Sequence, residues 1–218
     1  MPRIIDVLLS LLALLSLLPL FIPIVIILLL TGEHKVFYLQ TRVGYKNKDF
    51  KIIKFATMLS NSANMGSGSL TLRNDPRVLP FGSFLRKTKI NELPQILNII
   101  IGDLSIVGPR PQMQVDFEKY SDDVQGKIYN VRPGLTGIGS IVFRDEESLI
   151  SLAAENENPH DFYKRVIAPY KGELEIWYHS HRSVFLDFQL IFMTAWAIVF
   201  PETKLYEKWF KDLPKRKF

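Results

Sequence analysis

Two arginines beside prolines are the residues of this chain whose surroundings most directly suggest chemistry. Arg110 lies between Pro109 and Pro111. Arg132 directly precedes Pro133. Because proline fixes its own φ angle and restricts the residue before it, each guanidinium group projects from stiff backbone. Guanidinium binds phosphate through two parallel hydrogen bonds, and a stiff mount lowers the entropy lost on binding. The two arginines therefore predict a site for a phosphorylated ligand.

A carboxylate could complete such a site. Glu92 follows Asn91, which we expect to cap a helix over residues 91–101 that ends at Gly102. A glutamate in the first turn of a helix is favoured by the helix dipole alone, without any functional role. Beside a phosphate, the same carboxylate would act as a metal ligand or as a general base.

A long apolar run near the start of the chain indicates where such a site would lie. Residues 7–30 contain no charged residue and would span about 36 Å as a straight helix, enough to cross a bilayer. The run is too long for a cleaved signal peptide, and no small-residue cleavage site follows it. Pro19 and Pro23 predict a kink in its middle. Positive residues flank it on both sides, namely Arg3 before it and Lys35, Arg42, Lys46 and Lys48 after it. A kinked transmembrane helix and a re-entrant hairpin with both ends in the cytoplasm fit this pattern equally well.

The segment after the apolar run predicts a small β-hairpin beside the membrane. Residues 35–40 are rich in β-formers, and residues 49–55 alternate apolar and lysine side chains. A polar loop over residues 60–76 follows. Near its end, Asp75 and Arg77 are either an ordinary turn pair or residues that orient a nucleotide.

Most of the remaining chain is expected to be helical. Residues 112–130 predict a mostly exposed helix, and residues 145–180 predict helical pieces broken near Asn158-Pro159 and Ala168-Pro169. Residues 184–200 are apolar again, and a tail with lysines and aromatic residues follows. This pattern favours a helix lying in the membrane interface, and a buried core helix fits it nearly as well.

Composition narrows the class of protein. The 218 residues suffice for one domain with a core, and the formal charge of +5 suits anionic lipids or phosphorylated ligands. That charge is too small to argue for a nucleic-acid partner. Because cysteine is absent, disulfides and thiolate metal sites are excluded. We expect a single, mainly α domain with a small β-hairpin.

Residues 85–111 carry the motifs that make the sequence recognisable. They read Leu-Arg-Lys-Thr-Lys-Ile-Asn-Glu-Leu-Pro-Gln, then Ile-Leu-Asn-Ile-Ile-Ile, then Gly-Asp-Leu-Ser-Ile-Val-Gly-Pro-Arg-Pro. This stretch resembles the bacterial sugar transferase family, the monotopic phosphoglycosyl transferases, whose pattern is Arg-Lys-Thr/Ser, Asp-Glu-Leu-Pro-Gln and Gly-Asp-Met-Ser-Val-Gly-Pro-Arg-Pro. The resemblance covers about residues 1–190. Further matching segments are Arg3-Ile-Ile-Asp6, Pro19, Gln40-Thr-Arg-Val-Gly44, residues 50–58 and Arg132-Pro-Gly-Leu-Thr-Gly137.

The resemblance implies transfer of a sugar 1-phosphate from a UDP-sugar to undecaprenyl (polyprenyl) phosphate, with release of UMP. This is the initiating step in the assembly of surface polysaccharides and glycoconjugates such as exopolysaccharide, capsule, O-antigen and lipopolysaccharide. The family uses Mg²⁺. Membrane lipid is a further implied partner, and a homodimer and downstream glycosyltransferases are candidate partners.

The resemblance also implies how the chain is arranged at the membrane. Residues 1–34 would form a re-entrant membrane helix hairpin that breaks at Pro19. Residues 35–218 would form a cytoplasmic catalytic domain with interfacial amphipathic helices. The protein is then monotopic and lies on the cytoplasmic face of the bacterial inner membrane.

Site roles follow from the same resemblance. Arg110 would hold a phosphate, and Glu92 would serve metal binding or proton transfer. The predicted substrate-binding set is completed by Arg86, Arg132, Asp75, Arg77 and Asp103.

One position departs from the family pattern at the reaction centre. The Asp of the Asp-Glu pair is assigned in the family as the nucleophile that becomes phosphorylated, and Asn91 stands at that position. A carboxamide cannot form the acyl phosphate that a carboxylate forms. Three readings follow: Glu92 or another carboxylate such as Asp103 is the nucleophile, the lipid phosphate attacks directly while Glu92 binds metal, or the chain is inactive.

Because Glu92 and the arginines of the pattern are kept, we expect activity. The alternative is a catalytically silenced membrane scaffold that binds nucleotide sugar or lipid phosphate. Two lesser departures are Ala56, where the family often has Lys, and residues 139–146, which differ from many members and could mark a different sugar preference.

Overall fold

The N-terminal helix α1 (Arg3–Leu30) is the longest element of the computed structural model, which describes residues 1–66, 68, 70–72 and 74–218. It is apolar along its length, and by length and composition it could cross a membrane. The chain then forms the hairpin of β1 (Phe37–Val43) and β2 (Asp49–Phe55), which pair antiparallel around the short turn η1 (Tyr45–Asn47). The hairpin is confirmed, and its second strand has the predicted bounds. The first strand begins two residues later than expected, because a turn follows α1.

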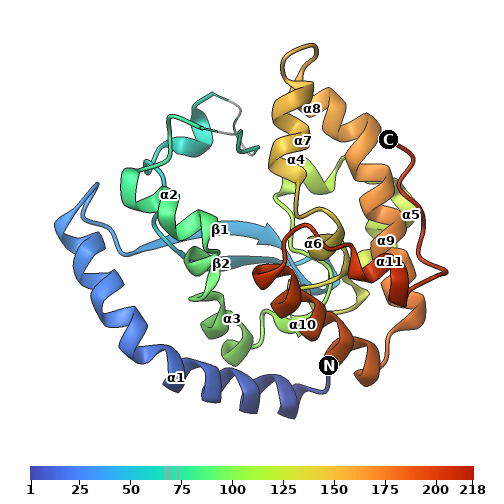
Figure 1. Ribbon diagram of the computed structural model, residues 1–218, viewed down its shortest axis with the longest axis horizontal. Coiled ribbons are helices and arrows are strands. Elements are labelled where there is room, and N and C mark those ends of the chain that lie inside the picture. Colours follow the sequence, from blue (N-terminus) through green and yellow to red (C-terminus); the bar gives the residue numbers. More distant parts are fainter. Residues whose placement is uncertain (67, 69, 73) are drawn as a thin grey trace.

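Both ends of α1 contact the rest of the molecule. In Figure 1, α1 passes along one side of the fold and bends, so that its C-terminal part turns back toward the other elements. At its start, Arg3 donates to the carbonyl oxygens of Ile99 and Ile100 at 2.5 and 2.8 Å. Near its end, Ile24 and Leu28 are buried in a small apolar cluster with residues of the hairpin and of α2 (Pro80–Lys87).

The expected break at Pro19 is wrong. Helix α1 continues through both Pro19 and Pro23, so the segment is one bent helix and not two helices joined by a break. Each proline removes one backbone hydrogen bond and bends a helix without having to end it, and the surrounding leucines favour helix.

The segment that carries Asn91 differs from the expected helix. After the turn η2 (Ser62–Asn64) and α2, Lys89 takes a left-handed conformation with φ 61° and reverses the chain into the turn η3 (Ile90–Glu92). Helix α3 (Gln95–Ile101) begins only after Pro94. Asn91 is therefore buried inside a turn and caps no helix, which corrects the sequence prediction. The predicted end at Gly102 is confirmed, with φ 115°.

A second, two-stranded sheet was not predicted. Strands β3 (Ser105–Val107) and β4 (Gly134–Thr136) pair in parallel. A Cβ atom on Gly108 would lie 2.4 Å from a backbone oxygen of Arg132, so only glycine permits this close approach of the two loops. Between the strands, the expected helix over residues 112–130 is divided into α4 (Gln114–Phe117), α5 (Asp122–Lys127) and η4 (Ile128–Asn130).

The C-terminal part is helical and holds most of the core. Its elements are α6 (Ile138–Val142), α7 (Glu146–Ala153), α8 (Pro159–Phe162), the π-helical turn η5 (Tyr163–Ile167), α9 (Ala168–His181), α10 (Val184–Val199) and α11 (Leu205–Trp209). The break before Pro159 is confirmed. The break at Ala168-Pro169 is wrong, because the wider π-helical turn leads into α9 and places Pro169 in its first turn.

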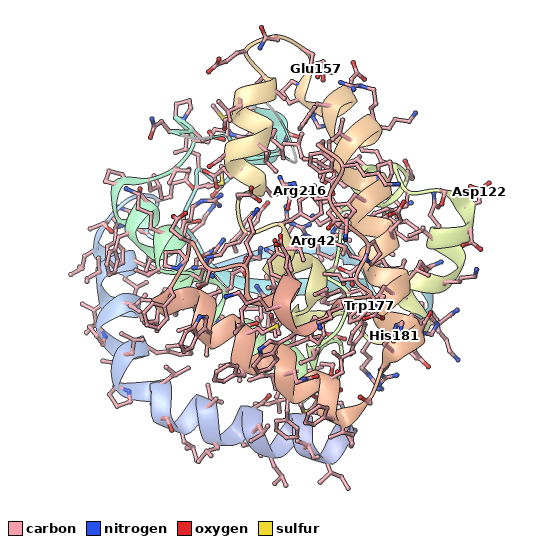
Figure 2. All side chains as sticks on the ribbon, turned by 45° about the vertical axis from the view of Figure 1, so that its right-hand side comes forward. Arg42, Asp122, Glu157, Trp177, His181 and Arg216 are labelled. Carbon is pink, nitrogen blue, oxygen red and sulfur yellow. The ribbon has the colours of Figure 1, made fainter. Side chains whose placement is uncertain are left out.

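The C-terminal tail packs back on α9. Trp177 and His181 lie on this helix (Figure 2), and their rings stack with centroids 4.7 Å apart. Trp177 Nε1 donates to Asp212 in the tail at 2.9 Å, and Phe210 packs on the same indole ring. One face of α10 lies in the core, and the other exposes apolar side chains, among them Phe185, Phe188 and Phe192. The mainly helical fold with one small antiparallel hairpin agrees with the expected fold class.

Candidate active site

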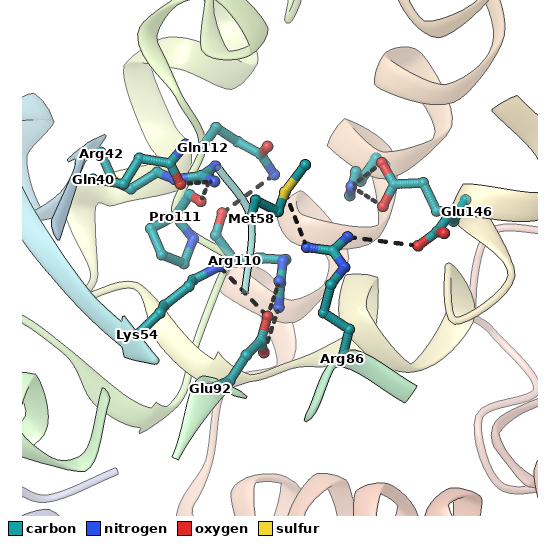
Figure 3. A network of polar contacts seen from close by, with 12 residues as sticks. Gln40, Arg42, Lys54, Met58, Arg86, Glu92, Arg110, Pro111, Gln112 and Glu146 are labelled. Atoms are coloured by element: carbon teal, nitrogen blue, oxygen red, sulfur yellow. Dashed lines mark hydrogen bonds and ion pairs between the residues drawn. The ribbon is translucent and has the colours of Figure 1, made fainter. Parts of the chain in front are cut away.

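A partly buried ion pair forms the centre of the candidate site. Glu92 accepts hydrogen bonds from Arg110 Nη2 at 2.6 Å and Nη1 at 3.4 Å. The Glu92 side chain is 15% exposed and that of Arg110 is 32% exposed. Lys54 on β2 adds a second cation, with its Nζ 3.5 Å from Glu92 Oε1 (Figure 3). The site therefore joins the hairpin, η3 and the loop after β3.

The backbone of Arg110 is fixed by a buried tyrosine. The Tyr129 hydroxyl donates to the Arg110 carbonyl at 2.9 Å and accepts from the Gln112 amide at 2.9 Å. The amide of Gly134 donates to the Pro109 carbonyl at 2.9 Å. These bonds add to the stiffness of the flanking prolines, so the guanidinium group has a defined position.

Cations outnumber carboxylates around Glu92, and burial acts together with these charges on the pKa values of the site. Burial alone would raise the pKa of Glu92, but Arg110 and Lys54 outweigh it and hold that pKa well below its usual range. Burial lowers the pKa of Lys54 to about 7, although Glu92 opposes the shift. Burial also lowers the pKa of Lys89. An anionic ligand would relieve the repulsion among these cations, which favours phosphate as the group bound here.

Two buried polar atoms from residues near Glu92 in the sequence lack a hydrogen-bond partner among the described residues, namely Asn91 Oδ1 and Gln95 Nε2. Buried polar groups are normally paired, so these two mark a place where a ligand could supply the partner. Mg²⁺ takes oxygen ligands, commonly one or two carboxylates completed by substrate phosphates. Glu92 and Asn91 Oδ1 fit that pattern. No cluster of three or more His, Cys, Asp or Glu side chains occurs in the described ranges, so phosphates would have to complete the coordination.

Arg86 lies at the edge of this site. Its Nη1 is 3.7 Å from Met58 Sδ, and its Nη2 is 3.8 Å from Glu147 Oε2 at the start of α7. Both contacts are weak, and the Glu147 side chain is half exposed. The Arg86 guanidinium can therefore turn to a bound phosphate at low cost.

A second charged cluster lies behind Arg110. Lys171 of α9 is almost fully buried and donates to both oxygens of Glu146 at 2.8 Å. Glu175, one turn further along α9, is also buried. Burial raises its pKa to about 8, against the opposing effects of Lys171 and the Arg110 backbone N–H. Helix α9 thus supports the loop that carries Arg110.

Asp75 and Arg77 lie apart from the ion pair and hold their own loop together. Arg77 donates to both Asp75 oxygens, from Nε at 2.8 Å and from Nη2 at 2.6 Å. It also donates to the carbonyl oxygens of Ser62, Met65 and Leu70 at 2.7 to 2.8 Å. The guanidinium is buried and engaged, which favours the turn pair over a contact with nucleotide.

Arg132 and Asp103 lie at the opposite end of α3 from Glu92. Arg132 Nε donates to the Gly102 carbonyl at 2.9 Å. Asp103 accepts from Asn98 Nδ2 at 3.2 Å. The structure therefore brings together Asn91, Glu92, Arg110 and Arg86 from the predicted set and leaves Arg132, Asp103, Asp75 and Arg77 outside. Pro19 lies within α1.

An apolar cavity of about 240 Å³ lies at the end of α1. Leu28 and Gly32 line it on the α1 side, and Phe81 lines it on the α2 side. Met58, which contacts Arg86, and Ala56 also line it. The cavity therefore extends from the end of α1 to Met58, the residue that Arg86 contacts.

Three charged residues of the site were missed at the sequence level. Lys54 was placed only on a strand, although it lies within the segment 50–58 that resembles the family. Lys89 lies inside the quoted motif, but only its left-handed backbone shows that it turns the chain toward Glu92. Glu175 belongs to no motif, and no sequence signal could have found it.

Fold and site together define a mainly helical protein with one long apolar helix and a cationic pocket around a carboxylate. Comparison with known proteins identifies the family, because the model of the bacterial sugar transferase family matches residues 1–201. A Sinorhizobium fredii protein named "Exopolysaccharide production protein ExoY" is 38% identical over 163 residues, covering 68% of this chain and 72% of that protein. The chain therefore belongs to the bacterial sugar transferase family, and its family and relatives place it among the phosphoglycosyl transferases.

Two further relatives have names that state a reaction. The Aeromonas hydrophila "UDP-N-acetylgalactosamine-undecaprenyl-phosphate N-acetylgalactosaminephosphotransferase" is 31% identical over 89% of this chain. The Escherichia coli "UDP-glucose:undecaprenyl-phosphate glucose-1-phosphate transferase" is 32% identical over 87% of this chain. The chain spans only 42% and 38% of the length of these two proteins. Their names give different sugars, so similarity alone does not choose a sugar.

Proposed function

We propose that this protein transfers a sugar 1-phosphate from a UDP-sugar to polyprenyl phosphate and releases UMP, initiating glycan assembly at a membrane. The observation that carries the proposal is the Arg110–Glu92 pair, set among further cations in a chain that also has an apolar cavity at the end of α1. The cations would bind the diphosphate of the donor, and the apolar cavity would admit the lipid chain of the acceptor.

The chemistry exchanges one phosphorus–oxygen bond for another. The phosphorus attached to the sugar is attacked by an oxygen of the acceptor phosphate, the bond to the bridging oxygen breaks, and UMP leaves with that oxygen. Arg110, Lys54 and Arg86 would neutralise the charge that both phosphate substrates bring together. Such catalysis depends on positioning and charge stabilisation more than on a strong base.

The arrangement around Asn91 favours direct attack over a covalent intermediate. Glu92 is bound by Arg110 and Lys54, which lowers its pKa and makes its carboxylate a poor nucleophile. Asp103 lies at the other end of α3. Mg²⁺, held by Glu92 and Asn91 Oδ1 with substrate phosphates, would add charge neutralisation at the phosphates when bound.

We also propose that α1 is re-entrant. Both ends of the helix contact the same globular part, through Arg3 at one end and Leu28 at the other, so both ends belong on one side of a membrane. The exposed apolar face of α10 would lie in the membrane interface. The site would then open toward the cytoplasm, where nucleotide sugars are made.

The rival proposal is a silenced scaffold that binds nucleotide sugar or lipid phosphate without transfer. Asn91 is the observation that favours it, because the family nucleophile is absent while the binding groups remain. The two proposals differ in one product, UMP.

The decisive experiment measures UMP release by the purified protein in nanodiscs, with a panel of UDP-sugars, undecaprenyl phosphate and Mg²⁺. The unchanged chain and Asn91→Asp are compared side by side. Turnover by the unchanged chain supports transfer without an aspartyl intermediate. Turnover by Asn91→Asp alone, with equal binding of UDP-sugar by both proteins, would establish the scaffold and overturn the proposal.

A further inference from the structure

A polar cavity of about 120 Å³ lies away from the Glu92 site, at the N-terminal end of α1. Segments that are distant in sequence meet there: α1, the turn η1, strand β3, the loop before β4 and the connection between α9 and α10. Its polar side chains are those of Asp6, Tyr45, Ser105, Asn130, Arg132 and Arg182, and Met1 also lines it. The cavity is therefore formed by the fold as a whole. It contains Arg132, which lies outside the Glu92 site.

The two arginines of this cavity have terminal nitrogens without partners in the part of the chain that the structure describes, unlike Arg110 at the Glu92 site. Arg132 is oriented by its Nε bond to the Gly102 carbonyl and by the Tyr45 ring, whose centroid lies 5.3 Å from its guanidinium carbon. Neither contact uses its two terminal nitrogens. Among the described residues, no side chain or backbone group forms a hydrogen bond or ion pair with the Arg182 guanidinium, although its charge acts on Tyr178. Two guanidinium groups thus present free N–H donors at one cavity.

The carboxylates nearby are already engaged. Asp6 accepts from Ser105 Oγ at 2.8 Å and from the Ile106 amide at 3.0 Å, which uses one bond on each oxygen. Asp187, at the start of α10, accepts from the Tyr178 hydroxyl at 2.7 Å. The lining therefore carries two exposed arginines and the Met1 amino group, which pairs with Asp187 at 2.7 Å, against the single carboxylate of Asp6. That excess of positive charge favours an anion.

Exposed apolar residues next to the lining indicate where the anion comes from. Ile4 on α1 is 74% exposed, two residues from Asp6. Phe185 on α10 is 73% exposed, three residues from Arg182. Apolar side chains that enter a bilayer beside arginines place those arginines at the level of the lipid headgroups.

We propose that Arg132 and Arg182 bind the phosphate group of a membrane lipid in this cavity, separate from the site of transfer. The proposal rests on the membrane placement of α1 and α10 proposed above and is independent of the transfer reaction. The same phosphate chemistry can come from a phospholipid headgroup or from polyprenyl phosphate. Planar guanidinium groups suit either, because they donate in pairs to phosphate oxygens.

The test counts lipids that remain bound to the full chain. The protein is reconstituted in phosphatidylcholine nanodiscs containing a small fraction of either phosphatidylglycerol or undecaprenyl phosphate. Native mass spectrometry then measures the anionic lipid retained on release, with no nucleotide sugar present. We expect retention by the unchanged chain, and at least a tenfold loss in Arg132→Gln/Arg182→Gln. The lipid that is retained identifies the source, and either source supports the proposal.

Matched variants separate a site from general charge and from misfolding. Lys164→Gln/Arg165→Gln removes the same two charges from exposed positions elsewhere and is expected to retain lipid like the unchanged chain. Arg182→Gln alone replaces a side chain that forms no hydrogen bond or ion pair with the described residues, so the variant should fold normally. It should still retain at least threefold less anionic lipid than the unchanged chain. Equal retention by the unchanged chain, the Arg132/Arg182 variant and the control in both lipid mixtures would overturn the proposal. Because no transfer is measured, this result is distinct from failure of the proposed reaction.

Discussion

At the scale of single residues, Arg110 matters because its guanidinium group can bind through two nitrogens at once, which a lysine cannot do. Arg110 contacts both oxygens of Glu92, whereas a lysine could present only one point charge. We expect Arg110→Lys to lower the rate of UMP release by roughly 100-fold, the usual cost of one misplaced charge-stabilising donor. Arg165→Lys, an exposed residue paired with Glu157, is the matched control and should keep its rate. An unchanged rate in Arg110→Lys would remove Arg110 from the reaction.

Glu175 gives the fold a dependence on pH. Burial raises its pKa to about 8, from an ordinary value of 4.5 in the unfolded chain. Between these values the folded protein holds a proton that the unfolded chain has released. Stability therefore falls as pH rises through this window, by at most about 1.4 kcal/mol per pH unit. We expect the melting temperature to drop from pH 5 to pH 8, and to drop less in Glu175→Gln.

The control for this prediction is Glu155→Gln, which changes an exposed carboxylate of the same type. It should show the same decrease in melting temperature with pH as the unchanged chain. If Glu175→Gln also keeps the full decrease, then another group causes it.

At the scale of elements, the re-entrant arrangement proposed for α1 depends on its two prolines. Pro19 and Pro23 lie within the bent helix, and both of its ends contact the globular part. We expect Pro19→Leu/Pro23→Leu to restore two backbone hydrogen bonds and straighten the helix, so that it spans the bilayer. The chain has no cysteine, so single cysteines report topology without background.

The measurement labels Ile4→Cys and Lys35→Cys with a membrane-impermeant maleimide in intact cells and in opened cells. With the prolines present, both should react only in opened cells. With both prolines replaced, Ile4→Cys should react in intact cells while Lys35→Cys stays protected. Reaction of Ile4→Cys in intact cells with the prolines present would contradict the re-entrant arrangement.

The elements also show what the sequence could predict. Strand 49–55 and the end of α3 at Gly102 were predictable, because alternation and a left-handed glycine are local signals. The position of Asn91 was not, because Lys89 takes a conformation that sequence would assign to glycine or asparagine. Whether Arg132 lies with Arg110 depends on the parallel pairing of β3 and β4, a contact between distant segments.

At the scale of the whole molecule, the site lies where two halves of the chain meet. One half consists of α1, the hairpin, α2 and α3, and the other consists mainly of the helices after β4 (Figure 1). Glu92 and Lys54 come from the first half, and Arg110 follows β3, which pairs with β4 at the start of the second. The motifs pointed to Asn91, Glu92, Arg86 and Arg110, but Lys171 and Glu175 behind Arg110 come from a helix with no motif. The residues that support Arg110 from behind could therefore not be predicted from the sequence.

We expect the lipid acceptor to enter through the apolar cavity at the end of α1, and filling this cavity tests that route. Ala56 lines the cavity and is 8% exposed. In Ala56→Leu the added carbons would occupy space proposed for the first isoprenoid units of the acceptor. Losing the burial of one or two methylene groups should raise the KM for undecaprenyl phosphate by roughly fivefold. The KM for the UDP-sugar and the melting temperature should stay close to those of the unchanged chain, because the cavity is apolar and has room for the side chain. Ala154→Leu, the same substitution at the end of α7, is the control and should change neither KM. Equal increases in both KM values would show a distorted site, and an unchanged acceptor KM would show that the lipid reaches Arg110 by another route.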